Sequence, residues 1–242
     1  MPNDYFQFKQ FLVKQDKCAM KVCTDACLFG SLLPTSSGGI ELEKHVLDIG
    51  TGTGLLALMF AQKNADVIID SVEIDENAAE QAKQNFENSP WKERLRIYNK
   101  SIQEFAKSTP KKYDVIISNP PFFENDLKSE NKKRNLALHS DELSLAELVS
   151  IIERLLKKDG NFFCLLPYHR TKFFEELLFK YKLHVKEKIF IKQTPKYNYF
   201  RTIFWVDRLA TALIESEIII MDEHNEYTKG FREKLCDYYL RL

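Results

Sequence analysis

Short apolar runs alternate with amphipathic stretches from His45 onward. The apolar runs favour buried strands, and the stretches between them repeat apolar residues at helical spacing. This alternation is typical of an α/β fold, in which helices cover both faces of a mostly parallel sheet. We expect strands at residues 46–49, 67–74, 95–98, 113–118, 161–166, 183–191 and 199–206, and helices at residues 54–62, 76–88, 143–157 and 171–181.

The spacing of these elements predicts two details. Ser144 stands at the start of a helix-spaced apolar set, where its hydroxyl can cap the helix. Only residues 192–198 separate the last two strands, which leaves no room for a crossover helix. These strands should therefore pair antiparallel. The predicted fold is a Rossmann-like sheet of seven mostly parallel strands, the last of which is antiparallel.

Two segments flank the predicted core at residues 45–207, and the 242 residues fit one domain. Residues 1–34 contain alternating runs at 5–13 and 18–22, which predict a hairpin ahead of a helix capped at Thr24. Residues 210–242 contain an apolar run at 218–221 and an aromatic-rich end. We interpret both segments as extensions of a single domain.

The composition is that of a folded protein without charge bias. Hydrophobic residues make up 44%, and 35 basic residues balance 35 acidic ones. Contact with a polyanion would therefore need a local basic patch. The cysteines number five, an odd count that predicts reduced thiols. They form no CxxC pair, which predicts no metal site. With no apolar leader and no run of about 18 apolar residues, we expect a cytoplasmic protein without a membrane partner.

A glycine turn at residues 50–54 follows the first expected strand, in the sequence DIGTGTG. Glycine permits positive φ and lets the backbone approach a ligand closely. A dinucleotide fingerprint would need glycine at position 55, where the chain has Leu55. The carboxylate of Asp48 would repel a pyrophosphate but suits the cationic amino acid end of S-adenosylmethionine. We therefore predict a binding site for this methyl donor at Asp48, Gly50, Thr51, Gly52 and Gly54.

Two later strand ends extend the predicted donor site. Glu73 ends the second strand, about 20–25 residues after the glycine turn, where a carboxylate can accept hydrogen bonds from both ribose hydroxyls. Asp75 should open the next helix and line the same site. Ser101 follows the third strand, where methyltransferases hold the adenine edge, although the usual aspartate is missing there.

The fourth expected strand ends in SNPPFF, and residues 119–122 are called the acceptor turn. Its prolines fix φ and remove backbone donors, which leaves carbonyl oxygens without partners. The side-chain oxygen of Asn119 and the carbonyl of Pro120 can accept both hydrogens of an amino group and orient its lone pair toward a methyl donor. The predicted catalytic residues are Asn119, Pro120, Pro121 and, as a stacking face, Phe122. Asn119 also borders the donor site.

Motifs along nearly the whole chain carry a resemblance to one family. They are the run from Phe8 to Asp25, the sequences VLDIGTGTGLLALM, VEID and ISNPPFF, residues 136–139, and the tail from Tyr227 to Leu240. The chain resembles the bacterial tRNA1(Val) (adenine(37)-N6)-methyltransferases, which belong to the class I S-adenosylmethionine-dependent methyltransferases. The resemblance implies that an adenine in a tRNA anticodon loop is methylated at N6.

The same resemblance implies that Lys21, Thr24 and Asp25 help to close the donor pocket. On chemistry alone, Lys21 and Asp25 could equally form a surface pair. The expected partner is tRNA, and no obligate protein partner is evident from the sequence.

Contact with tRNA predicts basic surfaces, and two stretches are candidates. One follows the acceptor turn and contains Lys128, Lys132, Lys133 and Arg134. The other lies near the last hairpin, where Lys192, Lys196 and Arg201 flank Tyr197, Tyr199 and Phe200. Mixed basic and aromatic residues suit phosphate contact and stacking on unpaired bases, although lysine-rich loops are commonly only solvated.

Three alternatives remain open from the sequence. A release-factor glutamine N5-methyltransferase shares the N-P-P-aromatic turn but carries a sizeable helical N-terminal domain, whereas only about 45 residues precede the first strand here. An rRNA guanine-N2 methyltransferase typically needs a second large domain. A catalytically silent RNA-binding module would not need the intact Asp48, Glu73 and Asn119.

Overall fold

An eight-stranded sheet forms the centre of the protein in a computed structural model, which describes residues 3–18, 20–35, 44–120 and 143–242. The strand order is β10-β8-β9-β7-β6-β3-β4-β5. Their bounds are β3 Lys44–Ile49, β4 Val67–Glu73, β5 Leu95–Asn99, β6 Tyr113–Ser118, β7 Leu156–Pro167, β8 His184–Lys192, β9 Arg201–Asp207 and β10 Ile214–Ile219. Every pairing is parallel except those of β9, which runs antiparallel to β7 and β8.

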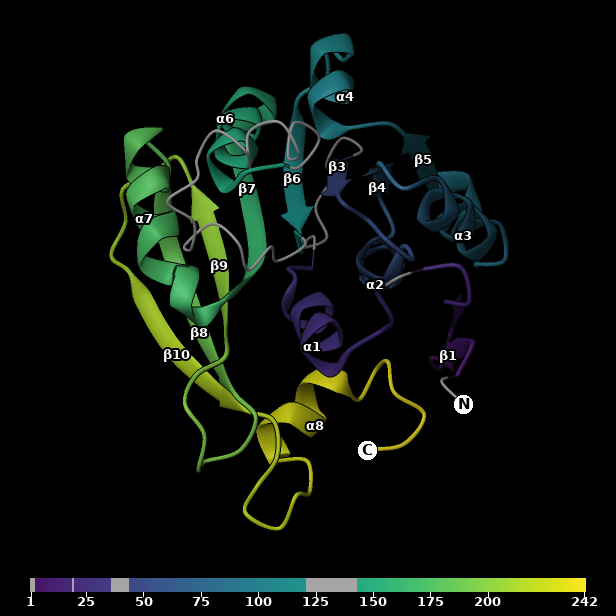
Figure 1. The fold of residues 1–242 in the computed structure, drawn as a ribbon, viewed down its shortest axis with the longest axis vertical. Helices are drawn as coiled ribbons and strands as arrows, with labels where there is room; N and C mark the ends of the chain where they lie inside the picture. The colour runs from purple at the N-terminus through teal and green to yellow at the C-terminus, as the bar shows by residue number, and fades with distance from the viewer. Residues whose placement is uncertain (1–2, 19, 36–43, 121–142) are drawn as a thin grey trace, which may run out of the picture.

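Helices lie on both faces of this sheet (Figure 1). One face carries α4 (Ile102–Ser108), α6 (Leu145–Leu155) and α7 (Thr171–Lys180). The other carries α1 (Thr24–Leu32), α2 (Leu55–Lys63) and α8 (Lys229–Leu235), and α3 (Glu76–Glu87) adds its apolar side to the same core. Two short 3-10 helices, η1 (Lys92–Arg94) and η3 (Tyr168–Arg170), precede β5 and α7. Both faces of the sheet are therefore covered by helices. The loops that follow the parallel strands meet at the carboxyl edge of the sheet, which the helices leave uncovered.

Hydrogen bonds at helix starts explain where two of these helices begin. Ser144 accepts from the backbone N–H of Glu147, and the Glu147 carboxylate accepts in return from the Ser144 N–H. The predicted Ser144 cap is thus confirmed as a complete capping box. Ser101 and Glu104 form the same arrangement at α4, a helix that the apolar pattern did not predict.

The sheet confirms the predicted mostly parallel topology with an antiparallel last core strand, which is β9. The expected count of seven is wrong by one strand, because β10 pairs in parallel with β8 at the edge. The apolar run at 218–221 overlaps the end of β10. The first four residues of β10 are exposed, so the apolar pattern did not predict a strand there. Within the described ranges, no helix has both the length and the apolar character needed to cross a membrane.

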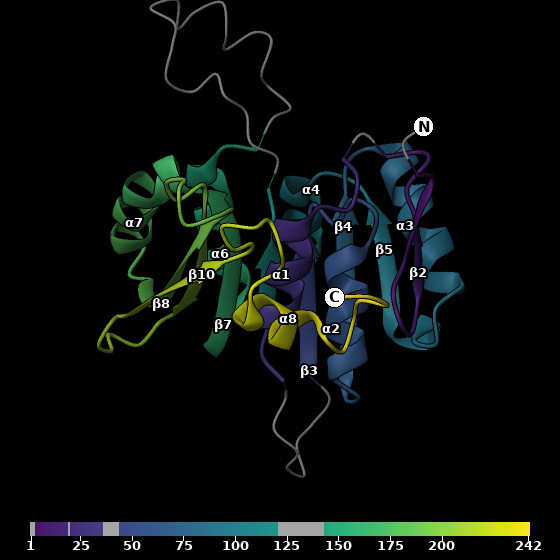
Figure 2. The ribbon, with the colours of Figure 1, turned by 90° about the horizontal axis from the view of Figure 1, so that it is seen from below.

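The N-terminal extension also differs in detail from the prediction. Its hairpin pairs β1 (Tyr5–Gln7) with β2 (Leu12–Lys14), so the first alternating run, extended by one residue, holds both strands. The hairpin lies beside α3 (Figure 2). Helix α1 is present, but Thr24 is its first residue and Cys23 is the N-cap, without a side-chain hydrogen bond. The predicted Thr24 cap is therefore wrong.

Candidate active site

The glycine turn joins β3 to α2 through three residues with positive φ. The φ values are +70° at Gly50, +56° at Gly52 and +82° at Gly54. A Cβ on Gly50 or Gly52 would meet no atom within 4 Å, so the backbone there faces open space. A Cβ on Gly54 would instead collide with the ring of Phe86 in α3. Gly50 and Gly52 thus leave room for a ligand, whereas Gly54 allows α2 and α3 to pack closely.

Asp48 lies beneath this turn and is fully buried. Its Oδ2 accepts a hydrogen bond of 2.5 Å from the hydroxyl of Thr51, whereas its Oδ1 has no hydrogen-bond partner among the described residues. Burial raises the pKa of Asp48 from 3.8 to about 7, and the nearby charge of Glu73 acts in the same direction, against the lowering effects of the Thr51 hydroxyl and the Ala57 backbone N–H. A buried carboxylate with one vacant oxygen favours a cation close by.

Glu73 ends β4 next to the glycine turn and is held by backbone donors. Its Oε2 accepts from the Gly52 N–H at 2.9 Å, and its Oε1 accepts from the Asp75 N–H at 3.0 Å. Each carboxylate oxygen can accept two hydrogen bonds, so one acceptor position on each remains. The carboxylate is thus fixed in direction and still able to receive a pair of hydroxyls.

The two other predicted residues at these strand ends have structural partners. The side chain of Asp75 caps α3 by accepting from the Ala78 N–H at 2.8 Å, which confirms that Asp75 opens the helix. The side chain of Ser101 caps α4. Asn99, which was not predicted, donates to the carbonyls of Glu73 and Ile74 and so fixes the turn after β4. The Ile74 side chain is 57% exposed there and offers an apolar surface beside Glu73.

The N-terminal segment runs beside the glycine turn because two amides of α3 hold it. Asn85 accepts from the Lys14 N–H and donates to the carbonyls of Lys14 and Thr53. Gln81 accepts from the Lys17 N–H. The next residue, Cys18, is close enough to Glu73 for its negative charge to raise the thiol pKa, together with the larger effect of burial. Sequence reasoning missed these contacts because they join residues 64 and 71 positions apart.

Of the N-terminal residues implied by the resemblance, Asp25 has the most defined environment. It is buried, and its Oδ2 accepts from the Nε of Arg201 at the start of β9, at 2.8 Å. Lys21 instead donates to the carbonyl of Asn3 at 3.2 Å. The alternative of a surface pair between Lys21 and Asp25 is therefore wrong. Thr24 is half-buried at the start of α1.

The acceptor turn begins beside the glycine turn, because Ile49 of β3 pairs with Ser118 of β6. The Ser118 hydroxyl donates to the Ile49 carbonyl at 3.0 Å and ties the two strand ends together. The Oδ1 of Asn119 is buried and has no hydrogen-bond partner among the described residues. Pro120 is buried next to it, whereas Pro121 and Phe122 lie outside the described residues, as do Lys128, Lys132, Lys133, Arg134 and residues 136–139.

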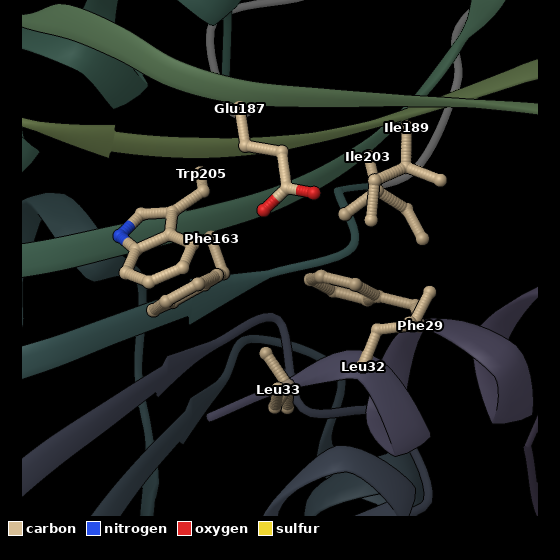
Figure 3. A pocket seen from close by; sticks show the side chains of 8 residues that line it. All are labelled: Phe29, Leu32, Leu33, Phe163, Glu187, Ile189, Ile203 and Trp205. Carbon is tan, nitrogen blue, oxygen red and sulfur yellow. The ribbon is translucent and has the colours of Figure 1, made fainter. Parts of the chain in front are cut away.

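A separate apolar cavity lies between α1 and the strands β7, β8 and β9. It is lined by Phe29, Leu32, Leu33, Phe163, Glu187, Ile189, Ile203 and Trp205. The carboxylate of Glu187 points in among the apolar side chains (Figure 3). None of the described residues of the glycine turn or the acceptor turn lines this cavity, so it is distinct from the described part of the candidate active site.

Comparisons with known proteins fit this geometry. A family model described as the methyltransferase small domain matches residues 23–169. The tRNA1(Val) (adenine(37)-N6)-methyltransferase of Cytophaga hutchinsonii is 42% identical over 248 residues, covering 100% of both chains. The chain belongs to this methyltransferase family. A protein of the same name from Trichodesmium erythraeum is 38% identical, again over 100% of both chains.

Solved structures agree on the fold. A predicted O-methyltransferase from Agrobacterium tumefaciens superposes with a TM-score of 0.69 over 88% of this chain and 96% of its own, at 13% identity. Another similar structure, a putative transferase from Pyrococcus horikoshii, gives 0.59 over 84% and 72%. At such low identity these likenesses support the class I methyltransferase fold alone. Membership of the family rests on the full-length relatives.

Proposed function

We propose that this protein transfers a methyl group from S-adenosylmethionine to the N6 amino nitrogen of adenine 37 in tRNA1(Val). The observation that carries the proposal is the pair of vacant, buried acceptor atoms at adjacent strand ends. Asn119 Oδ1 lies at the end of β6 and Asp48 Oδ1 lies near the end of β3, and each lacks a hydrogen-bond partner among the described residues. Most buried acceptors in folded proteins have a hydrogen-bond partner, so the donor groups of a ligand fit at these two atoms.

The residues of the glycine turn fit the methyl donor. Asp48 would hold its cationic amino group, and Gly50 and Gly52 leave the space that the amino acid end needs. Glu73 would accept from the ribose hydroxyls, and Ile74 offers an apolar surface to the adenine of the donor. Thr51 keeps the Asp48 carboxylate oriented. S-adenosylmethionine supplies, when bound, an electrophilic methyl group on a positively charged sulfur.

Asn119 would then act on the acceptor. Its vacant oxygen and the carbonyl of Pro120 can accept the two amino hydrogens of adenine, which orients the nitrogen lone pair. The amino group is conjugated with the ring and barely basic, so no side-chain base is required before transfer. An adenine in an anticodon loop is already partly unstacked, so moving it into the site costs only a few kcal/mol.

The decisive experiment is nucleoside mass spectrometry of total tRNA incubated with the protein and labelled S-adenosylmethionine. Labelled N6-methyladenosine at position 37 of a valine tRNA is the expected product. Label on a release factor or on rRNA, with none in tRNA, would support a methyltransferase activity but contradict tRNA as the substrate. Gel-shifted tRNA without any transfer would indicate a silent binding module. Because tRNA is the proposed substrate, we also infer that the protein acts in the cytoplasm.

A further inference from the structure

A compact group of three aromatic rings, the aromatic cluster, lies on the carboxyl edge of the sheet. Its members are Tyr168 in η3, Phe190 on β8 and Tyr199 in the loop before β9. Ring centroids are 5.2 Å apart for Tyr168 and Tyr199, 5.8 Å for Tyr168 and Phe190, and 5.1 Å for Phe190 and Tyr199. The Tyr168 side chain is 40% exposed, and the other two are half-buried. Three distant segments thus build one ring surface that is open on one side.

Strand register places this cluster on the same edge of the sheet as Asn119, one strand away. Cys164 of β7 pairs with Ser118 of β6, and Pro167, the residue before Tyr168, pairs with Arg201 of β9. Neighbouring strands lie about 4.8 Å apart. Asn119 follows Ser118 and is level with Leu165, so Tyr168 lies one strand away and three residues, or about 10 Å, further along. The cluster continues from there across β9 to β8, along the edge that carries the donor site. Nucleotides that flank a base held at Asn119 are within reach of it.

The lysine that lies over the cluster has a carboxylate partner. Lys192 lies over the Tyr199 ring, 4.6 Å from its centroid, and pairs with Glu217 of β10 at 3.4 Å. The Tyr199 hydroxyl donates to the same carboxylate at 2.7 Å. These contacts hold the Tyr199 ring in place and partner the lysine charge with a carboxylate. Such a surface suits the uncharged face of a base better than a phosphate group.

We propose that the aromatic cluster is the stacking surface for an unpaired nucleotide that flanks the target adenine in the RNA loop. The inference rests on the proposed function, since it requires RNA at Asn119. Stacking of one neighbour on Tyr168 anchors the loop while the target base turns into the acceptor turn. Base–aromatic stacking tolerates any base, so the cluster contributes affinity and positioning, and the acceptor turn selects the amino group.

The test uses Tyr168→Ala, Tyr168→Trp and, as a matched control, Phe179→Ala, which removes a ring that is 79% exposed near the end of α7. The substrates are tRNA transcripts with 2-aminopurine, a base whose fluorescence is quenched by stacking, on one or the other side of the target adenine. Wild type, Tyr168→Trp and Phe179→Ala should quench one of these probes. Tyr168→Ala should lose the quench and raise the KM for tRNA about tenfold, with kcat changed less than about threefold.

Three outcomes contradict the inference in different ways. Unchanged quenching and unchanged KM in Tyr168→Ala overturn the stacking role alone. Equal effects of Phe179→Ala and Tyr168→Ala show that loss of any surface ring weakens RNA contact, and they overturn the specific assignment. A wild-type protein that binds the donor but methylates no tRNA overturns the proposed function, and the stacking role with it.

Discussion

The buried carboxyl of Asp48 should make both stability and donor affinity depend on pH, and Asp48→Asn should remove both dependences. Burial raises the pKa of this group from 3.8 to about 7. The pKa of Asp48 is higher in the folded than in the unfolded protein, so protonation of its carboxyl stabilises the fold. This contribution to the free energy of unfolding is complete below about pH 4 and is lost as the pH rises through about 7. At about 1.4 kcal/mol per pKa unit the full contribution is about 4 kcal/mol, of which about 3 kcal/mol is lost between pH 5 and pH 8.

Urea unfolding of wild type and Asp48→Asn at pH 5 and pH 8 isolates this group, since other titrating groups cancel in the difference between the two proteins. The free energy of unfolding of the wild type should fall by about 3 kcal/mol relative to the variant between the two pH values. Identical pH dependence in both proteins would refute the raised pKa.

The pH dependence of donor binding provides a second test of the Asp48 carboxyl. A cation beside Asp48 favours its ionised form, so binding below about pH 7 should release a proton. The donor affinity of the wild type should rise up to about tenfold per pH unit between pH 5 and pH 7 and then level off. Asp48→Asn should bind more weakly, without that rise. Calorimetry in two buffers of different ionisation enthalpy measures the released proton directly, and a buffer-independent enthalpy at pH 6 would contradict the proposed contact.

The remaining residues give three more tests. Asn119→Ala should lower kcat by about 100-fold or more while donor affinity, measured by calorimetry, stays within about threefold; full activity would remove Asn119 from the acceptor role. Glu73→Ala should weaken donor binding by roughly 2–3 kcal/mol, and unchanged affinity would rule out the ribose contact. Arg201→Ala should destabilise the protein by roughly 1–3 kcal/mol in urea unfolding, because it leaves the buried Asp25 carboxylate without its guanidinium. Adding Asp25→Asn should recover part of that loss, and a purely additive double variant would show that the ion pair contributes nothing.

The features that the sequence predicted correctly depend on neighbours along the chain. Glycine at positions 50, 52 and 54 corresponds to three positive φ values in one turn, and Ser144 with Glu147 is a capping pair three residues apart. Apolar periodicity located the core strands because both faces of the sheet are covered. It failed for β10, whose first residues alternate without burial at the sheet edge, and for α4, which spans only seven residues. Edge strands and helices of about two turns leave too little apolar pattern to recognise.

The basic surface near the last hairpin shows what tertiary pairing adds. The sequence grouped Lys192, Lys196 and Arg201 as candidates for phosphate contact. In the structure Arg201 is paired with Asp25, which lies 176 residues away, and Lys192 is paired with Glu217. Two of the three charges therefore have carboxylate partners that no local pattern could indicate. Folding has the opposite effect on the aromatic residues of this stretch, since it adds to the stacking surface. Tyr199 contacts rings from β8 and η3, which are separate from it in the sequence. RNA contact at this edge should accordingly depend less on salt than a bare lysine cluster would, since counterion release follows uncompensated charge.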